Sequence, residues 1–185
     1  MDFVRPQQGE SFLTEPFGFE CVTCGEYHVG MPSFGWDYPV QYLLIPEQER
    51  DRRIELSSDA CVIDEKWFFV RGCLEIPVRE HEEPFSWGVW CSLSEENFQR
   101  YEKLFDRVAR EAGESFFGWL CSAIPGYPDT QQLKTMVRVR AWPTRPLVHL
   151  EPTNHPLAVE QREGLTVERA REIAERIMHP PRAEG

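Results

Sequence analysis

Three potential metal ligands lie within eight residues of one another near the start of the chain, and this cluster constrains the fold more than any other feature. Cys21 and Cys24 are separated by two residues, Gly25 follows, and His28 stands four positions after Cys24. A tight turn of this kind brings both sulfur atoms to one tetrahedral ion, while Gly25 permits a positive φ directly after the second ligand. The spacing therefore predicts a zinc knuckle over residues 21–28, with His28 supplying a nitrogen ligand.

A structural zinc ion takes four protein ligands, so the fourth must come from another part of the chain. Our first choice is Cys61, because it begins a predicted strand and could meet the knuckle across a sheet edge; His155 is the second. Spacing alone does not choose between them. A ligand from a distant strand would convert metal affinity into tertiary stability, so we expect the ion to hold the N-terminal segment to the sheet.

Two other interpretations of the Cys21 and Cys24 pair stay open. The pair could be unliganded thiols, or it could be a thioredoxin-like redox pair, although no strand-helix pattern follows the motif as that fold requires. Four protein ligands would close the metal site and leave no position for a water molecule. The closed set favours a structural zinc ion over a catalytic one.

Charge and length limit the partners and the location of the protein. A chain of 185 residues fits a single domain, and 31 acidic against 20 basic residues give a net charge of −11. Such a charge repels phosphate backbones, so we expect no binding to nucleic acid. No apolar run reaches the roughly 18 residues that span a bilayer, and the start lacks the basic and apolar regions of a signal peptide. We expect a cytoplasmic protein without a membrane partner.

Short apolar or alternating segments, bounded by turn residues, predict a protein rich in strands. The expected strands cover residues 17–21, 61–63, 67–70, 74–78, 85–93, 116–124, 135–142 and 147–150. Because residues 67–70 are all apolar, we expect that strand to be central and covered on both faces. No glycine-rich phosphate loop or internal repeat is present, which excludes nucleotide binding by such loops.

Two longer segments have the periodicity of amphipathic helices. The first is capped by Ser94 and ends at Gly113; the second follows Thr166 and carries predicted surface ion pairs, including Arg171 with Glu175. The apolar stripes are Phe98, Tyr101, Phe105, Val108 and Ala112 in the first helix, and Val167, Ala170, Ile173, Ala174 and Ile177 in the second.

Together these elements predict an α+β fold: a mostly antiparallel sheet with two main helices packed on it and an N-terminal zinc knuckle. We divide the chain into a flexible arm over residues 1–14, a single α+β domain over residues 15–179 and a tail over residues 180–185.

Several segments together resemble an uncharacterised bacterial family, the domain of unknown function DUF2199. They are residues 21–25 with His28, then 59–64, 68–72, 74–77, 87–90, 93–94 with Asn97 and Phe98, 127–128 and 155–164. The resemblance implies a bacterial protein. It also favours Cys61 over the three later cysteines as a ligand, because Cys61 lies within a family-like segment. The family implies no reaction.

Two classes of function remain after these exclusions. In the first, the protein is a binding or interaction module, whose excess of acidic groups suits a protein partner of basic character. In the second, it is a small hydrolase or redox enzyme that uses the zinc and cysteine region, with Cys61 as nucleophile and His155 as base. An open metal site or a thiol of lowered pKa would favour the enzyme. The sequence assigns no oligomeric state.

Overall fold

The computed structural model describes residues 16–105, 113–141 and 143–179, so the predicted arm and tail lie outside the described residues. The strands are β1 (Gly18–Glu20), β2 (Tyr27–Val29), β3 (Ser33–Gly35), β4 (Ile54–Leu56), β5 (Ala60–Ile63), β6 (Trp67–Ile76), β7 (Phe85–Leu93), β8 (Ser115–Leu120), β9 (Lys134–Arg138) and β10 (Leu147–Leu150). The helices are η1 (Val40–Leu44, a 3-10 helix), α1 (Glu47–Arg53), α2 (Glu95–Phe105), α3 (Pro156–Glu163) and α4 (Val167–Met178).

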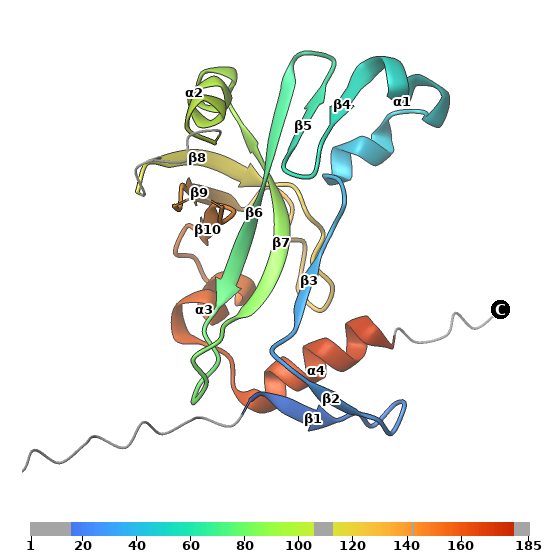
Figure 1. The fold of residues 1–185 in the computed structure, drawn as a ribbon, viewed down its shortest axis with the longest axis vertical. Coiled ribbons are helices and arrows are strands. Elements are labelled where there is room, and N and C mark those ends of the chain that lie inside the picture. Colours follow the sequence, from blue (N-terminus) through green and yellow to red (C-terminus); the bar gives the residue numbers. More distant parts are fainter. Residues whose placement is uncertain (1–15, 106–112, 142, 180–185) are drawn as a thin grey trace, which may run out of the picture.

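Five consecutive strands, β6 to β10, close into a barrel (Figure 1). Each strand pairs antiparallel with the next, and β10 then returns to β6 in the parallel direction, with Leu147 opposite Cys73. The α+β class is confirmed, but the expected simple antiparallel sheet is wrong. Closure is favoured because it pairs the edge groups that an open sheet leaves unsatisfied.

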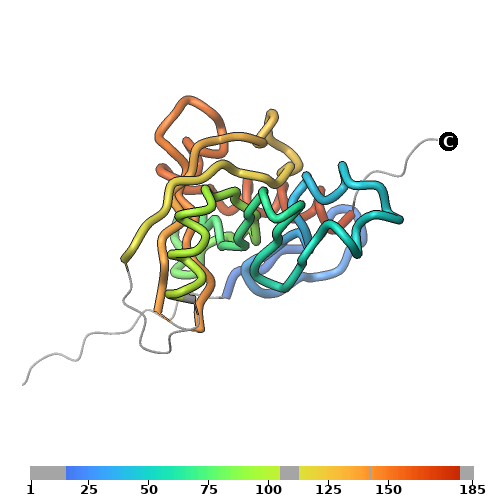
Figure 2. The backbone as a smooth tube through the Cα atoms, turned by 90° about the horizontal axis from the view of Figure 1, so that it is seen from above, coloured from blue at the N-terminus to red at the C-terminus, as the bar shows by residue number. Residues whose placement is uncertain are grey.

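The long strands β6 and β7 each change neighbours along their length. The first residues of β6 pair with β5, which continues to β4, and the later part meets β10. The first part of β7 pairs in parallel with β3, and its last part pairs with β8. Seen from above, β4, β5 and α1 extend from one side of the barrel, away from β8 to β10 (Figure 2).

This splitting of β6 places it between two apolar cores. Val70 faces the main core inside the barrel, whereas Phe69 faces a second core outside it, against Trp90 and Cys61. Both faces of this part of the strand are therefore covered, as predicted. Trp67 is the exception, because it begins the strand at the exposed turn after β5 and is 55% exposed.

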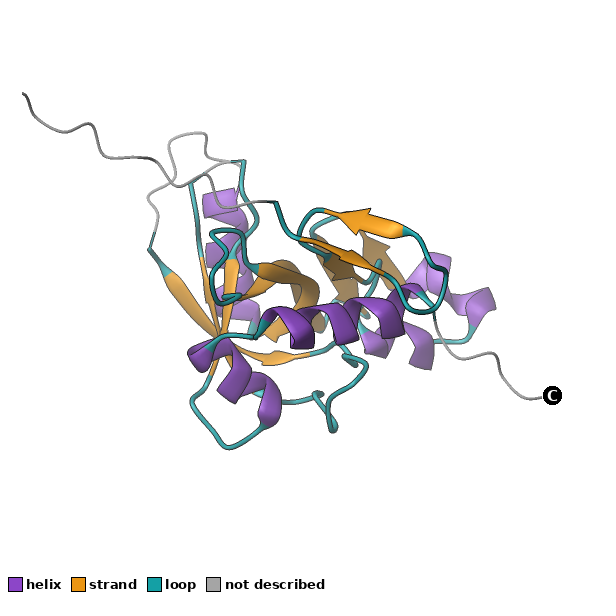
Figure 3. Cartoon of the chain, turned by 90° about the horizontal axis from the view of Figure 1, so that it is seen from below, coloured by secondary structure: helices purple, strands orange, loops and turns teal. Residues whose placement is uncertain are grey.

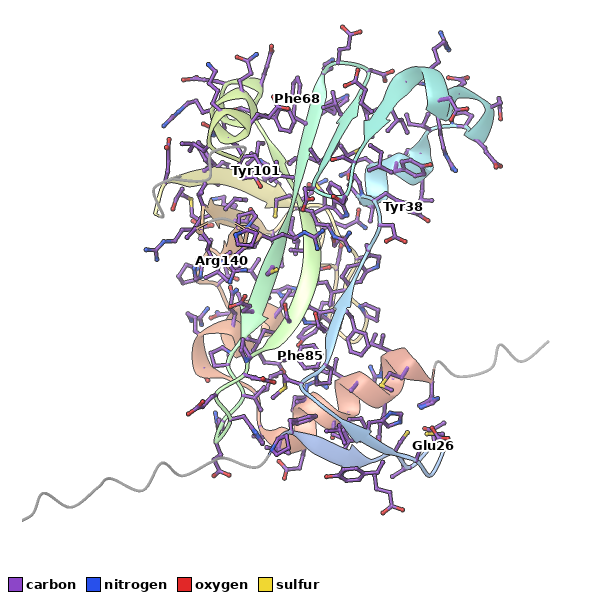
Figure 4. All side chains as sticks on the ribbon, in the orientation of Figure 1. Glu26, Tyr38, Phe68, Phe85, Tyr101 and Arg140 are labelled. Atoms are coloured by element: carbon purple, nitrogen blue, oxygen red, sulfur yellow. The ribbon has the colours of Figure 1, made fainter. Side chains whose placement is uncertain are left out.

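Helix α2 covers one end of the barrel as an amphipathic helix. It begins where the sequence predicts, since the Ser94 hydroxyl accepts a hydrogen bond from the Asn97 N–H at 3.3 Å. Phe98 packs on Phe68 of β6, with ring centroids 5.1 Å apart, and Figure 4 shows Phe68 and Tyr101 between the helix and the barrel. The predicted continuation through Val108 and Ala112 lies outside the described residues.

Helix α4 lies at the other end of the molecule (Figure 1), and the view from below shows it beside the β1–β2 hairpin (Figure 3). Thr166 caps it as predicted, accepting from the Arg169 N–H at 3.2 Å, and Ala170, Ile173 and Ala174 are buried. No helix in the described part of the chain is long and apolar enough to cross a membrane. The hairpin and α4 together position the cysteine cluster.

Candidate metal centre

The sequence predicts a zinc knuckle over residues 21–28, and in the structure this segment is a tight turn that leads from β1 into β2; we refer to it as the knuckle. The Gly25 N–H donates to the Cys21 carbonyl at 2.8 Å, and the Cys21 N–H donates to the Glu26 carbonyl at 2.9 Å. Gly25 has a φ of +74°, a left-handed conformation that is strained for residues with a Cβ. Figure 4 shows Glu26 at the tip of this hairpin, near the end of α4.

Four side chains meet at this turn: Cys21, Cys24, His28 and His179. Each offers one ligand atom, and all four atoms lie within 4.8 Å of one another, so the cluster could hold a metal ion. The Cys24 Sγ is 3.4 Å from the His28 Nε2. A tetrahedral ion with bonds of about 2.0–2.3 Å separates its ligand atoms by roughly 3.3–3.8 Å. Small side-chain rotations would bring the cluster to that spacing.

His179 enters this cluster from the end of α4. Its backbone N–H donates to the Glu175 carbonyl at 2.9 Å, and its ring lies 6.0 Å from the His28 ring, measured between centroids. The Nε2 of His179 is buried and has no hydrogen-bond partner among the described residues. A buried polar atom without a partner is costly, and a metal ion would satisfy this nitrogen.

A second contact fixes the knuckle to the same helix turn. The Glu175 Oε1 accepts a hydrogen bond from the Val22 N–H at 3.0 Å. The sequence predicts that Glu175 pairs with Arg171 on the helix surface, but the carboxylate binds the knuckle backbone instead. Glu175 and His179 are one turn apart on α4, so both connect the helix to the hairpin.

The two thiols of the knuckle differ in acidity. Desolvation raises the pKa of Cys21, but the backbone N–H groups of Cys24 and Thr23 outweigh it and hold the pKa below the ordinary value. For Cys24 a hydrogen bond from the Glu26 backbone lowers the pKa, yet desolvation and the neighbouring Cys21 raise it overall. A bound cation would stabilise both thiolates.

The structure does not bring the first-choice fourth ligand, Cys61, to the knuckle. Cys61 lies on β5 and is fully buried in the second core with Phe69 and Trp90. Side chains alternate between the two faces of β5, and the Cys61 side chain is on the face that packs into this core. Desolvation there raises the pKa of the Cys61 thiol to about 12. Among the described residues, the fourth member of the cluster is His179.

The second choice, His155, has a structural role at the start of α3. Its Nδ1 accepts a hydrogen bond from the Leu157 N–H at 3.2 Å, which caps the helix. Figure 1 places α3 and β5 in separate parts of the molecule, so His155 is not beside Cys61. A buried thiol of raised pKa without a neighbouring base does not make a nucleophile, and the geometry does not support the hydrolase interpretation of this pair.

Sequence reasoning missed His179 because no spacing rule connects a histidine near the C-terminus with a knuckle near the N-terminus. One signal was present: His179 directly follows the apolar stripe of α4. The packed face of a helix determines which way a side chain at its end points. The sequence does not show where α4 docks, so it does not show what His179 would meet.

The described residues define an α+β protein with a closed barrel and a cysteine-histidine cluster at its N-terminal hairpin. The chain belongs to the bacterial family DUF2199, described as an uncharacterized protein conserved in bacteria, whose model matches residues 20–165. This match confirms the resemblance seen in the sequence. It includes Cys21, Cys24 and His28 and ends before α4, so His179 lies outside it. No curated protein and no solved structure matches the chain.

Proposed function

We propose that the protein is a binding module whose N-terminal hairpin is clamped to α4 by one structural zinc ion. The ligands are Cys21, Cys24, His28 and His179, and the observation that carries the proposal is that one ligand atom from each lies within 4.8 Å of the other three. Two thiolates and two imidazoles are a ligand set typical of zinc. Four protein ligands leave no position for substrate or water, which supports a structural role.

The ion would join two distant parts of the chain. Each strand of the hairpin has three residues, too few for an independently stable pair. A ligand from α4 therefore makes metal binding part of the folding free energy of this end of the molecule. The rigid surface that results is suited to binding a protein partner. The absence of nucleic-acid binding and the cytoplasmic location stay predictions from the sequence.

Elemental analysis of protein purified under reducing, chelator-free conditions tests the metal. We expect one zinc ion per chain in the wild type, and we expect His179→Ala to lose zinc and to melt at a lower temperature. Cys61→Ala and His155→Ala are the matched controls, because both residues lie outside the cluster and should retain zinc.

Two results would contradict this proposal. Wild-type protein without metal would remove the site altogether. Loss of zinc from Cys61→Ala together with full zinc in His179→Ala would restore the ligand set expected from the sequence and would require a different position for the hairpin.

A further inference from the structure

Strand β1 has one edge that pairs with β2 and one edge that faces away from it. The Gly30 N–H donates to the Phe17 carbonyl at 2.7 Å, and the Cys21 N–H donates to the Glu26 carbonyl at 2.9 Å. Antiparallel partners alternate between bonded and non-bonded pairs. Gly18 and Glu20 are in the non-bonded pairs, so their backbone N–H and C=O groups point away from β2.

This outer edge of β1 lines a groove against α4. A cavity of about 610 Å³ lies between the two elements, with residues 18–22 on one wall and Val167, Glu168 and Arg171 on the other. The Val22 N–H, next along the same edge, is bound by Glu175 of α4. That contact shows that this edge faces the helix at Val22. The N–H and C=O groups of Gly18 and Glu20 are thus directed at the cavity.

Arg171 lies on the helix wall of the groove. Its Nε is buried and finds no hydrogen-bond partner in the part of the chain that the structure describes. The expected partner on its own helix, Glu175, is engaged by the Val22 backbone. The backbone surface that the groove offers to a ligand is the outer edge of β1, and an extended segment pairs with such an edge through its own N–H and C=O groups.

The charged groups of the groove select the kind of ligand. Glu20 stands on the strand wall and Glu168 on the helix wall, and the chain carries a net charge of −11. Tyr27 also lines the cavity, and aromatic rings attract cations. A basic side chain would find carboxylates on both sides. A second copy of this chain would instead bring its own Glu20 against these groups, which like-charge repulsion disfavours.

We infer that an extended, basic segment of a partner protein binds in this groove and adds as a third strand to β1. The inference rests on the proposed function, since the zinc clamp holds the two walls together. The backbone of the segment pairs with Gly18 and Glu20 along the outer edge of β1. Its lysine or arginine side chains lie near Glu20 and Glu168.

Fluorescence anisotropy with a short labelled peptide of alternating lysine and valine tests this mode of binding. The same peptide with glutamate in place of lysine is the ligand control. We expect the basic peptide to bind the wild type and the acidic one not to bind. Glu20→Ala, which removes only a charge, should weaken binding a few-fold, whereas Glu20→Pro also removes the N–H directed at the groove and should weaken it about tenfold.

Val29→Pro is the matched control variant. Val29 is opposite Gly18 in a non-bonded pair, so its N–H points away from β1 on the far edge of the hairpin. The Val29→Pro variant should bind the basic peptide as tightly as the wild type does. Equal loss of binding in Val29→Pro and Glu20→Pro would show that any disruption of the hairpin suffices, and it would overturn strand addition at β1.

Zinc content measured on the same samples separates this inference from the proposed function. Zinc-loaded wild type that does not bind the basic peptide, or that prefers the acidic one, would overturn the inference and leave the clamp intact. Peptide binding by protein that contains no metal would overturn the clamp alone. Sedimentation is also needed: self-association that Glu20→Pro abolishes would assign the edge to a second copy of the chain and overturn the peptide site.

Discussion

At the scale of single residues, burial decides what each cysteine can do. Cys24 is exposed at the knuckle and contacts His28, so its sulfur is accessible to a metal ion. Cys61 and Cys91 are fully buried in apolar surroundings, and desolvation raises the pKa of both thiols. The same side chain is a candidate ligand in one place and a core residue in the other.

Cys61 should contribute to stability in a way that depends on pH. Its pKa is about 12 in the folded protein and 9.0 ordinarily, so the unfolded chain loses the thiol proton first as pH rises. This contribution is fully present below pH 9.0 and is lost as the pH rises toward 12. The free energy of unfolding of the wild type should therefore exceed that of Cys61→Ala by less at alkaline pH than at neutral pH.

Chemical denaturation of both proteins across this pH range measures the difference. Alkylation of the native protein gives an independent check, since Cys61 should stay unmodified near neutral pH. A difference in stability that stays constant with pH, or rapid alkylation of native Cys61, would show that the thiol is not desolvated.

At the scale of elements, the β1–β2 hairpin depends on α4 for its position. Within the hairpin, Phe19 is buried in the main core, and the knuckle is bound to the helix through Glu175 and the His179 cluster. The barrel strands, in contrast, pair on both edges and need no such contact. The two parts should therefore respond differently to loss of a metal ion.

Removal of the metal by a chelator should loosen this end of the molecule alone. We expect faster amide hydrogen exchange in β1, β2 and the last turn of α4, because each loses a tether, and unchanged exchange in β6 and β7. Hydrogen exchange measured by mass spectrometry with and without chelator tests this. Faster exchange throughout the barrel would mean that the site supports the whole fold, and no change in the hairpin would mean that the cluster binds no metal.

At the scale of the whole molecule, the barrel closes where glycine allows two strands to approach. A Cβ on Gly72 of β6 would lie 2.6 Å from the Val148 Cγ2 and 2.9 Å from the Pro146 carbonyl oxygen, at the seam between β6 and β10. Gly118 is similar, since a Cβ there would meet the Ser92 carbonyl oxygen. Larger residues at these positions would force the strands apart.

Gly72→Ala should destabilise the protein by about 1–3 kcal/mol, because the added methyl group meets backbone as well as a side chain. Gly88→Ala is the matched control: its neighbours are 3.5 Å or more from the added Cβ, which is ordinary contact, so its stability should differ little from that of the wild type. Urea denaturation compares the two variants. Equal stability of Gly72→Ala and the wild type would show that the seam is looser than this structure has it.

Much of the local structure follows from the sequence alone. The starts of α2 and α4 follow from Ser94 and Thr166, most barrel strands follow from their apolar patterns, and three of the four cluster members follow from the spacing of Cys21, Cys24 and His28. These features depend on residues a few positions apart, whose relative placement the backbone of a turn, helix or strand determines.

Only the tertiary structure decided which distant segments meet. The parallel return of β10 to β6, the burial of Cys61, the arrival of His179 at the knuckle and the groove beside β1 all depend on strand twist and on where α4 docks. Periodicity shows which face of an element is apolar but not which other element covers that face. Packing over the whole molecule determines which elements meet. The close approach of β6 to β10 and the docking of α4 set the positions of the side chains on these three elements.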